Sequence, residues 1–360
     1  MNLIKNLFLI IISTIVSLFL FEGALRISGI TPHKKLSAKK AKIFSQIHPI
    51  STEKDLEIGW VNKPGTYLLP DYKAMFRDYN SDSNLIMNTI FKDYNIIKDK
   101  YSNKRINILN NRSRITKINN SLEDKPKAFV MGCSVTFGDG VSDEETFSFH
   151  LQSRIQWLNI ENYGTPGHGT YQLLLQLERL YKQNQKLSYV IYGFGDFHEL
   201  RNLRTLEWYN ALNQQEEKVA VPYASLNKDE NAIIRFSPTP YPSFPLNQKS
   251  SLMSLLEVSY VKWLTRKSDS QKEKLMENIL LEINKLTSSN GSKFIIMFLI
   301  ASEEKSIHYK EFLRKNNIDF VDCRNSDYPQ KYNIPMNNHP DGELHEIWGK
   351  CIADHMDKLK

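Results

Sequence analysis

Hydrophobic and polar positions change their pattern at about Lys127. From there on, short apolar runs that predict buried strands alternate with segments of helical periodicity. The predicted strands cover 127–132, 159–163, 189–193, 293–300 and 318–322, and the predicted helices lie near 143–157, near 170–184 and across 250–288. A final helix places Leu344, Ile347, Trp348, Cys351 and Ile352 at i, i+3, i+4, i+7 and i+8. Such alternation predicts a parallel sheet covered by helices on both faces.

Other stretches lack this rhythm. Residues 29–60 are polar and rich in lysine, which indicates a tether. Residues 61–125 hold short alternating runs among Asn, Asp and Ser, which predict a small β-rich accessory region. Four prolines between 238 and 245 indicate an inserted loop region at about 200–250 within the domain that runs from 126 to 360.

The N-terminus is strongly apolar. Leu7 to Phe21 carries no charge, and the stretch to Leu25 approaches the roughly 20 residues that span a bilayer. No small-x-small cleavage site follows, so we predict an uncleaved signal anchor over 1–28. Six basic residues follow closely, from Arg26 to Lys42, and the positive-inside rule would keep that side cytoplasmic.

Composition narrows the function. The 360 residues suggest one to three domains, and the net charge of +7 is spread out without the basic and aromatic clusters of nucleic-acid binding. The three cysteines show no zinc spacing. Cys323 and Cys351 could pair in an oxidising compartment, which would leave Cys133 without a partner.

The most informative motif follows the first predicted strand of the α/β part. An apolar run ends at Gly132-Cys133-Ser134, and Ser142-Asp-Glu-Glu145 has the form of a capping box that opens a helix. Open α/β sheets place their chemistry at such strand ends. The turn would expose the Ser134 hydroxyl and leave backbone N–H groups free to bind an oxyanion.

Three further segments follow predicted strands or precede the last helix. They are Asn162-Tyr-Gly-Thr-Pro-Gly-His-Gly169, Gly193-Phe-Gly-Asp-Phe-His-Glu-Leu-Arg-Asn202 and Asn337-Asn-His-Pro-Asp-Gly-Glu-Leu-His345. Because parallel strands end at one edge of a sheet, the four segments are predicted to share one site.

In order and spacing, the four segments resemble the serine, glycine, third and C-terminal His-Pro blocks of the SGNH (GDSL-type) hydrolase superfamily. The closest variety is a membrane-anchored bacterial group whose serine block reads Gly-Cys-Ser-x-Thr-x-Gly-x-Gly-Val. The resemblance covers about 127–358. It implies a three-layer α/β/α flavodoxin-like domain, no cofactor or metal, and a catalytic domain on the periplasmic or extracytoplasmic side, against the lysine count.

The resemblance also implies roles for single residues. Ser134 would be the nucleophile, and its N–H would form the oxyanion hole with that of Gly164. His339 would take the Ser134 proton and return it to the leaving group, as in other serine–histidine pairs.

Three positions depart from the pattern of the superfamily. Cys133 replaces the Asp before the nucleophile. Gly195 replaces the Asn of the oxyanion hole, so either two backbone donors suffice or Tyr192, His198 or Arg201 fills the gap. The Asp that orients the histidine is absent, since Met336 and Asn337 stand there. Asn337, Asp322 or Asp327 could orient His339 instead, or the pair could act as a dyad.

These features predict a serine-dependent ester hydrolase or O-acyltransferase that acts on an envelope carbohydrate through an acyl-Ser134 intermediate. The expected partners are an acylated carbohydrate or small ester, the membrane through the N-terminal helix, and an envelope-modification complex, but no nucleic acid. His198 and Arg201 would line the cleft and favour a polar or anionic substrate. The alternatives are a degenerate SGNH domain that binds glycans or serves as a scaffold, and a lipid esterase or thioesterase.

Overall fold

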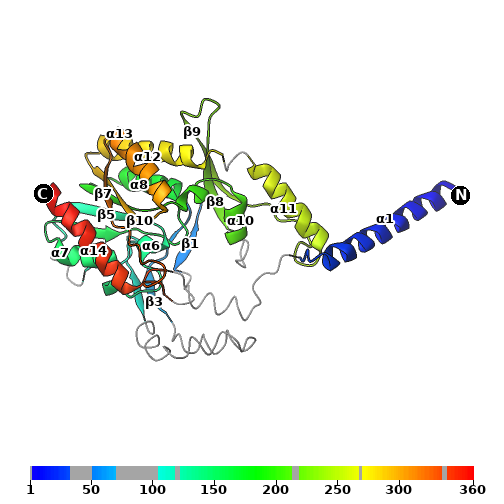
Figure 1. The fold of residues 1–360 in the computed structure, drawn as a ribbon, viewed down its shortest axis with the longest axis horizontal. Coiled ribbons are helices and arrows are strands. Elements are labelled where there is room, and N and C mark those ends of the chain that lie inside the picture. Colours follow the sequence, from blue (N-terminus) through cyan, green and yellow to red (C-terminus); the bar gives the residue numbers. More distant parts are fainter. Residues whose placement is uncertain are drawn as a thin grey trace.

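The computed structural model describes residues 2–32, 51–69, 104–117, 122–212, 219–266, 270–334 and 339–360. Its centre is a parallel sheet of five strands (Figure 1). The strands are β5 (Lys127–Gly132), β6 (Asn159–Asn162), β7 (Tyr189–Gly195), β10 (Lys293–Ile300) and β11 (Asp319–Asp322). The predicted parallel sheet is therefore confirmed.

The strand order identifies the topology. Across the sheet it runs β6, β5, β7, β10, β11, with every neighbouring pair parallel. Numbered along the chain, this is the 2-1-3-4-5 order of flavodoxin-like sheets, as predicted. The order reverses direction between β5 and β7, and in such sheets ligands bind beyond the carboxyl ends of the strands at that point.

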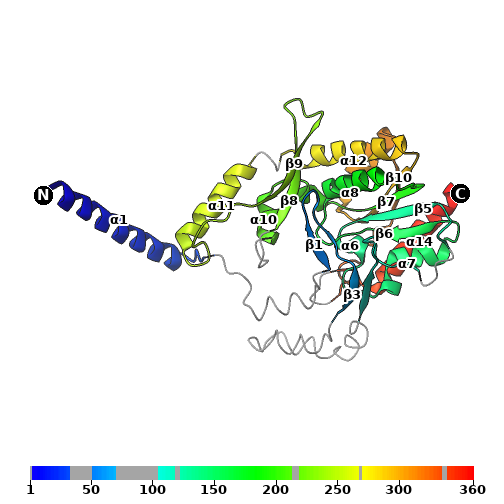
Figure 2. The same ribbon diagram turned by 180° about the vertical axis from the view of Figure 1, so that it is seen from behind.

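Helices cover both faces of the sheet (Figures 1 and 2). α7 (Phe147–Arg154) and α14 (Gly342–Met356) pack on one face, and α8 (Thr170–Lys182), α12 (Lys272–Ser289) and α13 (Glu303–Lys315) pack on the other. Side chains of β5 alternate between the two cores: Ala128 and Val130 face α7 and α14, whereas Phe129 and Met131 face α8 and α12. This period of two explains why the strand reads as a continuous apolar run.

Two antiparallel pairs precede the sheet. β1 (Thr52–Asp55) pairs with β2 (Gly59–Asn62), and β3 (Gly65–Leu68) pairs with β4 (Arg105–Ile108). Single bridges join Ile108 to Arg114 and Arg114 to Asn162, so the second pair is attached to the edge of the main sheet at β6. The predicted tether extends too far, because residues 52–60 already belong to the first pair.

The stretch 200–250 contains more than the predicted loops. It holds α10 (Leu206–Leu212) and a hairpin of β8 (Ala220–Leu226) and β9 (Ile233–Pro240), after the short α9 (His198–Arg201). Pro238 and Pro240 are tolerated because β9 pairs on one side only. The helical pattern over 250–288 forms two helices, α11 (Ser251–Thr265) and α12.

The N-terminal helix α1 (Asn2–Ile27) projects from the rest of the chain (Figures 1 and 2). An 18-residue window of its segment Leu3–Ile27 has a mean hydropathy of 2.3, and none of that window is buried against the protein. By length and composition, α1 can cross a membrane.

Candidate active site

Ser134 lies at the junction of β5 and a short helix, α6 (Ser134–Phe137). The sequence places the next helix near 143, so the structure starts helical geometry earlier than expected. Gly132 permits the junction: its φ is 155°, and an added Cβ would lie 2.2 Å from Thr136 Oγ1. The turn therefore needs glycine at this position.

Ser134 and His339 form a hydrogen-bonded pair. His339 Nε2 lies 2.9 Å from Ser134 Oγ. The histidine is held by a short antiparallel ribbon, because Ile334 N–H donates to His339 O and Asp341 N–H donates to Tyr332 O, both at 2.8 Å. Ser134 and His339 therefore meet at the predicted edge of the sheet.

The Ser134 N–H, a predicted oxyanion donor, lies in the first turn of α6. In α6 the first intrahelical bond is donated by Phe137 N–H to Cys133 O at 2.8 Å, so the N–H groups before it have no acceptor within the helix. Ser134 is one of them, and it contributes both the hydroxyl and this N–H.

Gly164 packs against α6, but its N–H already has an acceptor. An added Cβ on Gly164 would lie 2.4 Å from Phe137 N, which shows how closely the two backbones approach. The Gly164 N–H donates to Asn162 Oδ1 at 2.9 Å, and Asn162 Nδ2 donates to Thr136 O at 3.0 Å. The predicted donor must therefore leave Asn162 or share its hydrogen before it can bind an oxyanion.

Gly195 offers no side-chain donor, and the structure shows what fills the space. A Cβ at this position would lie 2.5 Å from the ring of Phe197. The Gly195 N–H donates to His198 Nδ1 at 3.3 Å. The place where an Asn side chain would begin is thus occupied by an aromatic ring.

The three candidate replacements are engaged with one another or with backbone. Tyr192 Oη lies 2.7 Å from His198 Nδ1, and burial lowers the pKa of His198 well below its usual value. Arg201 donates to the backbone oxygen of His168 at 3.1 Å and stacks over Phe197 at 4.7 Å. None of the three hydrogen-bonds to Ser134 in the part of the chain that the structure describes.

Three residues are predicted candidates to orient His339: Asn337, Asp322 and Asp327. Met336 and Asn337 lie outside the described residues. The Asp322 carboxylate is committed elsewhere: despite its burial, hydrogen bonds from Arg324 and Lys310 hold its pKa at about 2. Asp327 lies in a turn where its N–H donates to Asn325 Oδ1.

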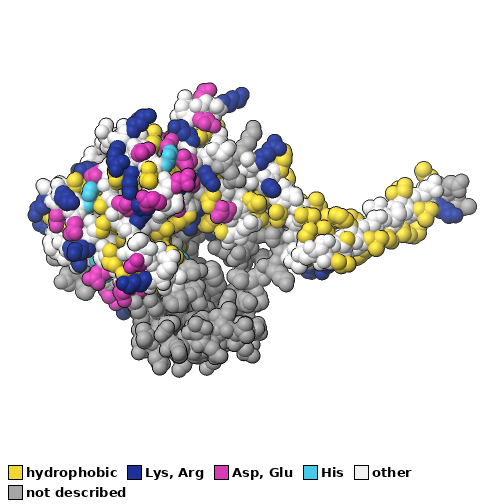
Figure 3. All heavy atoms as spheres, viewed as in Figure 1, with side chains coloured by type: hydrophobic (Ala, Val, Ile, Leu, Met, Phe, Trp, Pro, Cys, Tyr) yellow, Lys and Arg dark blue, Asp and Glu magenta, His cyan; other side chains and the backbone are white. Residues whose placement is uncertain are grey.

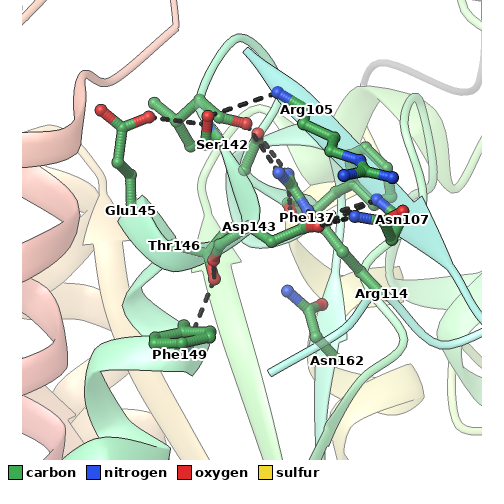
Figure 4. Close-up of polar contacts among 12 residues, drawn as sticks. Arg105, Asn107, Arg114, Phe137, Ser142, Asp143, Glu145, Thr146, Phe149 and Asn162 are labelled. Carbon is green, nitrogen blue, oxygen red and sulfur yellow. Dashed lines mark hydrogen bonds and ion pairs between the residues drawn. The ribbon is translucent and has the colours of Figure 1, made fainter. Parts of the chain in front are cut away.

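Sequence reasoning missed Arg114, which is fully buried beside the loop that follows Ser134 (Figure 4). Its guanidinium donates to Phe137 O at 2.8 Å and to Gly138 O and Val141 O, both at 2.6 Å. It also forms an ion pair with Asp143 at 2.8 Å. Burial lowers the pKa of Arg114, and the Asp143 carboxylate opposes this shift. Arg114 thus holds the loop that follows Ser134 by its backbone oxygens.

The capping box predicted for the same loop is present. Ser142 N–H donates to Glu145 Oε2 at 2.7 Å, and the box opens a 3-10 turn over Asp143–Glu145 (Figure 4). α7 follows directly, with Thr146 as its N-cap. Asp143 begins the 3-10 turn, and its carboxylate pairs with Arg114 and accepts hydrogen bonds from Asn107.

No family model and no curated protein matches the chain. The chain is similar to several solved structures at low identity. One is a lipolytic protein of the G-D-S-L family from Veillonella parvula, with 13% identity, a TM-score of 0.38, and coverage of 65% of this chain and 99% of that one. Another is a psychrotrophic esterase from Pseudoalteromonas, with 12% identity, a TM-score of 0.40, and coverage of 65% and 98%. A third is an acetyl xylan esterase from the rumen bacterium Butyrivibrio proteoclasticus, with 11% identity, a TM-score of 0.35, and coverage of 69% and 68%. At these values, the chemistry must be judged from the site itself.

Other features of the described residues bear on the site. They contain no group of three or more His, Cys, Asp or Glu that could hold a metal ion. A cavity of about 720 Å³ lies elsewhere, between the β1–β2 turn and α8, where the ion pair of Asp55 and Arg179 lines it. Neither Ser134 nor His339, the predicted nucleophile and base, lines this cavity.

Two of the three cysteines form a disulfide, and the third is free. Cys323 and Cys351 form a disulfide, with Cα atoms 5.8 Å apart, and Cys133 is buried and free. The disulfide joins the end of β11 to α14, the helix that follows His339. It therefore ties the helix that follows His339 to the sheet.

Proposed function

We propose that this chain is an SGNH-type serine ester hydrolase or O-acyltransferase that works through an acyl-Ser134 intermediate. The observation that carries the proposal is the 2.9 Å contact between Ser134 Oγ and His339 Nε2. The pair follows β5, next to the point where the strand order reverses. A structural serine needs no imidazole partner aimed at its hydroxyl.

The reaction follows from this geometry. His339 Nε2 accepts the Ser134 proton as Oγ attacks the ester carbonyl, and the Ser134 N–H binds the developing oxyanion. The protonated imidazole then gives its proton to the leaving alkoxide, and the acyl group remains on Ser134. Water or a sugar hydroxyl next attacks the acyl carbon and gives its proton to His339 Nε2. The bond from the acyl carbon to Ser134 Oγ then breaks, and His339 returns the proton to Ser134 Oγ.

We propose an acylated carbohydrate of the cell envelope as the substrate. The resemblance of the four blocks and the membrane-compatible helix α1 support this choice. The disulfide between Cys323 and Cys351 favours an oxidising, extracytoplasmic compartment for the domain. We place the protein as a single-pass, membrane-anchored enzyme of an envelope-modification complex.

A second candidate function has its own support. The N–H groups of Gly164 and Gly195 both donate within the chain, and no Asn side chain stands at 195. A site with only the Ser134 donor would lose roughly 3 kcal/mol of transition-state stabilisation for each missing donor. Such a loss favours a degenerate domain that binds a glycan or serves as a scaffold. A lipid esterase or thioesterase is a weaker alternative that α1 would suit.

A serine-reactive fluorophosphonate separates these functions. The full chain in detergent micelles is labelled and separated on a gel, alongside Ser134→Ala and His339→Ala. Ser153→Ala serves as the matched control, because Ser153 is exposed on α7. We expect wild type and the control to label and to hydrolyse an aryl acetate, and both site variants to lose these properties. Wild type that matches Ser134→Ala in both assays would exclude the enzyme.

Hydrolysis and transfer require a second measurement. The full chain is incubated with an ester that carries an isotope-labelled acetyl group, with and without an oligosaccharide acceptor. The products are identified by mass spectrometry. Acetate alone as product supports a hydrolase, whereas an acetylated oligosaccharide supports a transferase. Both products must vanish in Ser134→Ala, because both pass through the same intermediate.

A further inference from the structure

The apolar side of helix α11 faces outward, although its sequence pattern is that of a helix whose apolar side faces a core. Leu256, Tyr260, Trp263 and Leu264 fall on one side of the helix, as in the stripe that normally faces a core. In the structure they are 46%, 41%, 55% and 43% exposed. The opposite side, with Ser254, Glu257, Val261 and Thr265, is buried.

The buried side is fixed by polar contacts. The Glu257 carboxylate is fully buried and accepts hydrogen bonds from Tyr209 Oη, from the Phe244 N–H and from Asn247 Nδ2, the last at 2.9 and 3.0 Å. Rotating α11 to bury its apolar stripe would break these bonds and leave a carboxylate without partners. Because that loss is large for a buried charge, the stripe stays on the surface.

The N-terminus of α11 is joined to the end of α1. The Glu22 carboxylate accepts hydrogen bonds from Ser250 Oγ and from the N–H groups of Ser251 and Leu252, at 2.8 to 2.9 Å. Arg26 donates to Lys249 O at 2.7 Å. A side chain of the candidate membrane span thus caps the first turn of α11. The two helices meet at this joint and diverge from it (Figures 1 and 2).

The surroundings of the exposed stripe match a membrane surface. Apolar side chains gather where α1 meets α11 (Figure 3). Tyr260 and Trp263 are the aromatic types that favour the boundary between acyl chains and water. Lys262 and Arg266 are exposed beside the stripe, and Arg266 lies 5.3 Å from the centre of the Trp263 ring. Basic side chains at this depth attract anionic headgroups.

We propose that α11 lies in the lipid–water interface, with Leu256, Tyr260, Trp263 and Leu264 among the acyl chains and Lys262 and Arg266 on anionic headgroups. The bilayer is the occupant because α1, which can cross it, ends at the first turn of α11. The joint at Glu22 and the buried contacts of Glu257 then hold the α/β domain in one orientation to the membrane. Two attachments replace the free swing of a domain on a single tether.

Site-directed fluorescence measures this placement directly. The full chain is reconstituted in phosphatidylcholine vesicles with and without phosphatidylglycerol, and an environment-sensitive dye is attached to Leu256→Cys or Leu264→Cys. Asp229→Cys, exposed at the tip of the β8–β9 hairpin, is the control site. The chain without an introduced cysteine measures any labelling of the buried Cys133. Lipids with a nitroxide on the acyl chain quench dyes that reach the hydrocarbon.

We expect blue-shifted emission and strong quenching at both α11 sites, and neither at Asp229. Neutralising Lys262 or Arg266 should weaken the contact with anionic vesicles about fivefold for each charge. Quenching at the α11 sites no stronger than at Asp229 would overturn the proposal. Self-quenching between dyes on two labelled copies, without quenching by the lipid nitroxide, would show that the stripe contacts a second copy of the chain and would overturn the proposal. Emission typical of a dye in water, in vesicles that contain only this protein and lipid, would also overturn it and would point to a protein partner. Equal quenching in neutral and anionic vesicles would contradict the proposed contacts of Lys262 and Arg266 with anionic headgroups.

Discussion

Ser134 Oγ and His339 Nε2 lie 2.9 Å apart although 205 positions separate the two residues in the sequence. Groups that act as one unit show non-additive losses, because removing either partner already disables the other. We expect Ser134→Ala and His339→Ala each to lower kcat/KM for an aryl ester by about 10⁴-fold or more. The double variant should be no slower than the slower single variant.

The measurement is initial rate against substrate concentration, corrected for spontaneous hydrolysis. The Ser153→Ala control should match wild type. If the losses of the two single variants instead multiply in the double variant, the residues act independently and the proposed pair is wrong.

Arg114 should be essential for the stability of the loop that follows Ser134. Its guanidinium satisfies three backbone oxygens and Asp143, and removing one partner of a buried pair costs about 3–5 kcal/mol. We therefore expect Arg114→Met to lower the free energy of unfolding by about this amount. Arg114→Lys should be intermediate, because an ammonium cannot reproduce the planar set of five donors.

Arg112→Met is a matched control two positions away. The Arg112 side chain is 41% exposed and pairs with Glu53, so its loss should cost no more than about 1 kcal/mol. Urea unfolding in detergent micelles measures both changes. An Arg114→Met protein as stable as Arg112→Met would show that the loop after Ser134 does not depend on this residue.

The sheet and its two layers of helices could be predicted because their signals are local. The runs at β5, β7 and β10 are apolar after their first residues, as is typical of buried parallel strands, and the helices carry one apolar side. The disposition of Ser134 followed from the same pattern, since the end of a parallel strand defines the edge of the sheet. Its contact with His339 adds a distance that sequence cannot supply.

What sequence could not show depends on long-range contacts. Arg114 reads as one basic residue in a polar stretch, and only the fold brings it under Phe137 and Val141. The stripe on α11 has the periodicity of a core helix, but the buried Glu257 turns it outward. The hydrogen bond from the Gly164 N–H to Asn162 Oδ1 likewise could not be predicted from the identity of either residue.

The disulfide between Cys323 and Cys351 should contribute measurably to stability and report the compartment. It closes a loop with a sequence separation of 28, for which the chain-entropy estimate is about 3–4 kcal/mol. We expect Cys351→Ser, with Cys323→Ser to avoid a stray thiol, to unfold at lower urea concentration. Protein trapped with a thiol-blocking reagent in intact cells should carry the disulfide in full if the domain is extracytoplasmic. Blocked thiols at both positions would place the domain in the cytoplasm.

Stability should fall between about pH 6.5 and pH 4, a window that belongs to buried histidines. Burial lowers the pKa of His168 to about 4 and that of His345 to about 3, while the unfolded chain binds these protons near the ordinary value of about 6.5. The unfolded state therefore gains protons first as pH falls, and each residue removes about 3 kcal/mol by pH 4. Carboxylates with lowered pKa, such as Asp322, lose their contribution only at more acidic pH.

Urea midpoints measured across this window test the assignment. His345→Gln keeps an acceptor for the Phe147 N–H, which donates to His345 Nδ1 at 3.2 Å in the native chain. His168→Gln keeps a donor for the Trp60 backbone oxygen, which lies 2.8 Å from His168 Nε2. Each variant should have a lower midpoint than wild type at pH 7 and a flatter decline towards pH 4, because one proton fewer is taken up on unfolding. A decline as steep as that of wild type in both variants would assign the acid sensitivity to other groups.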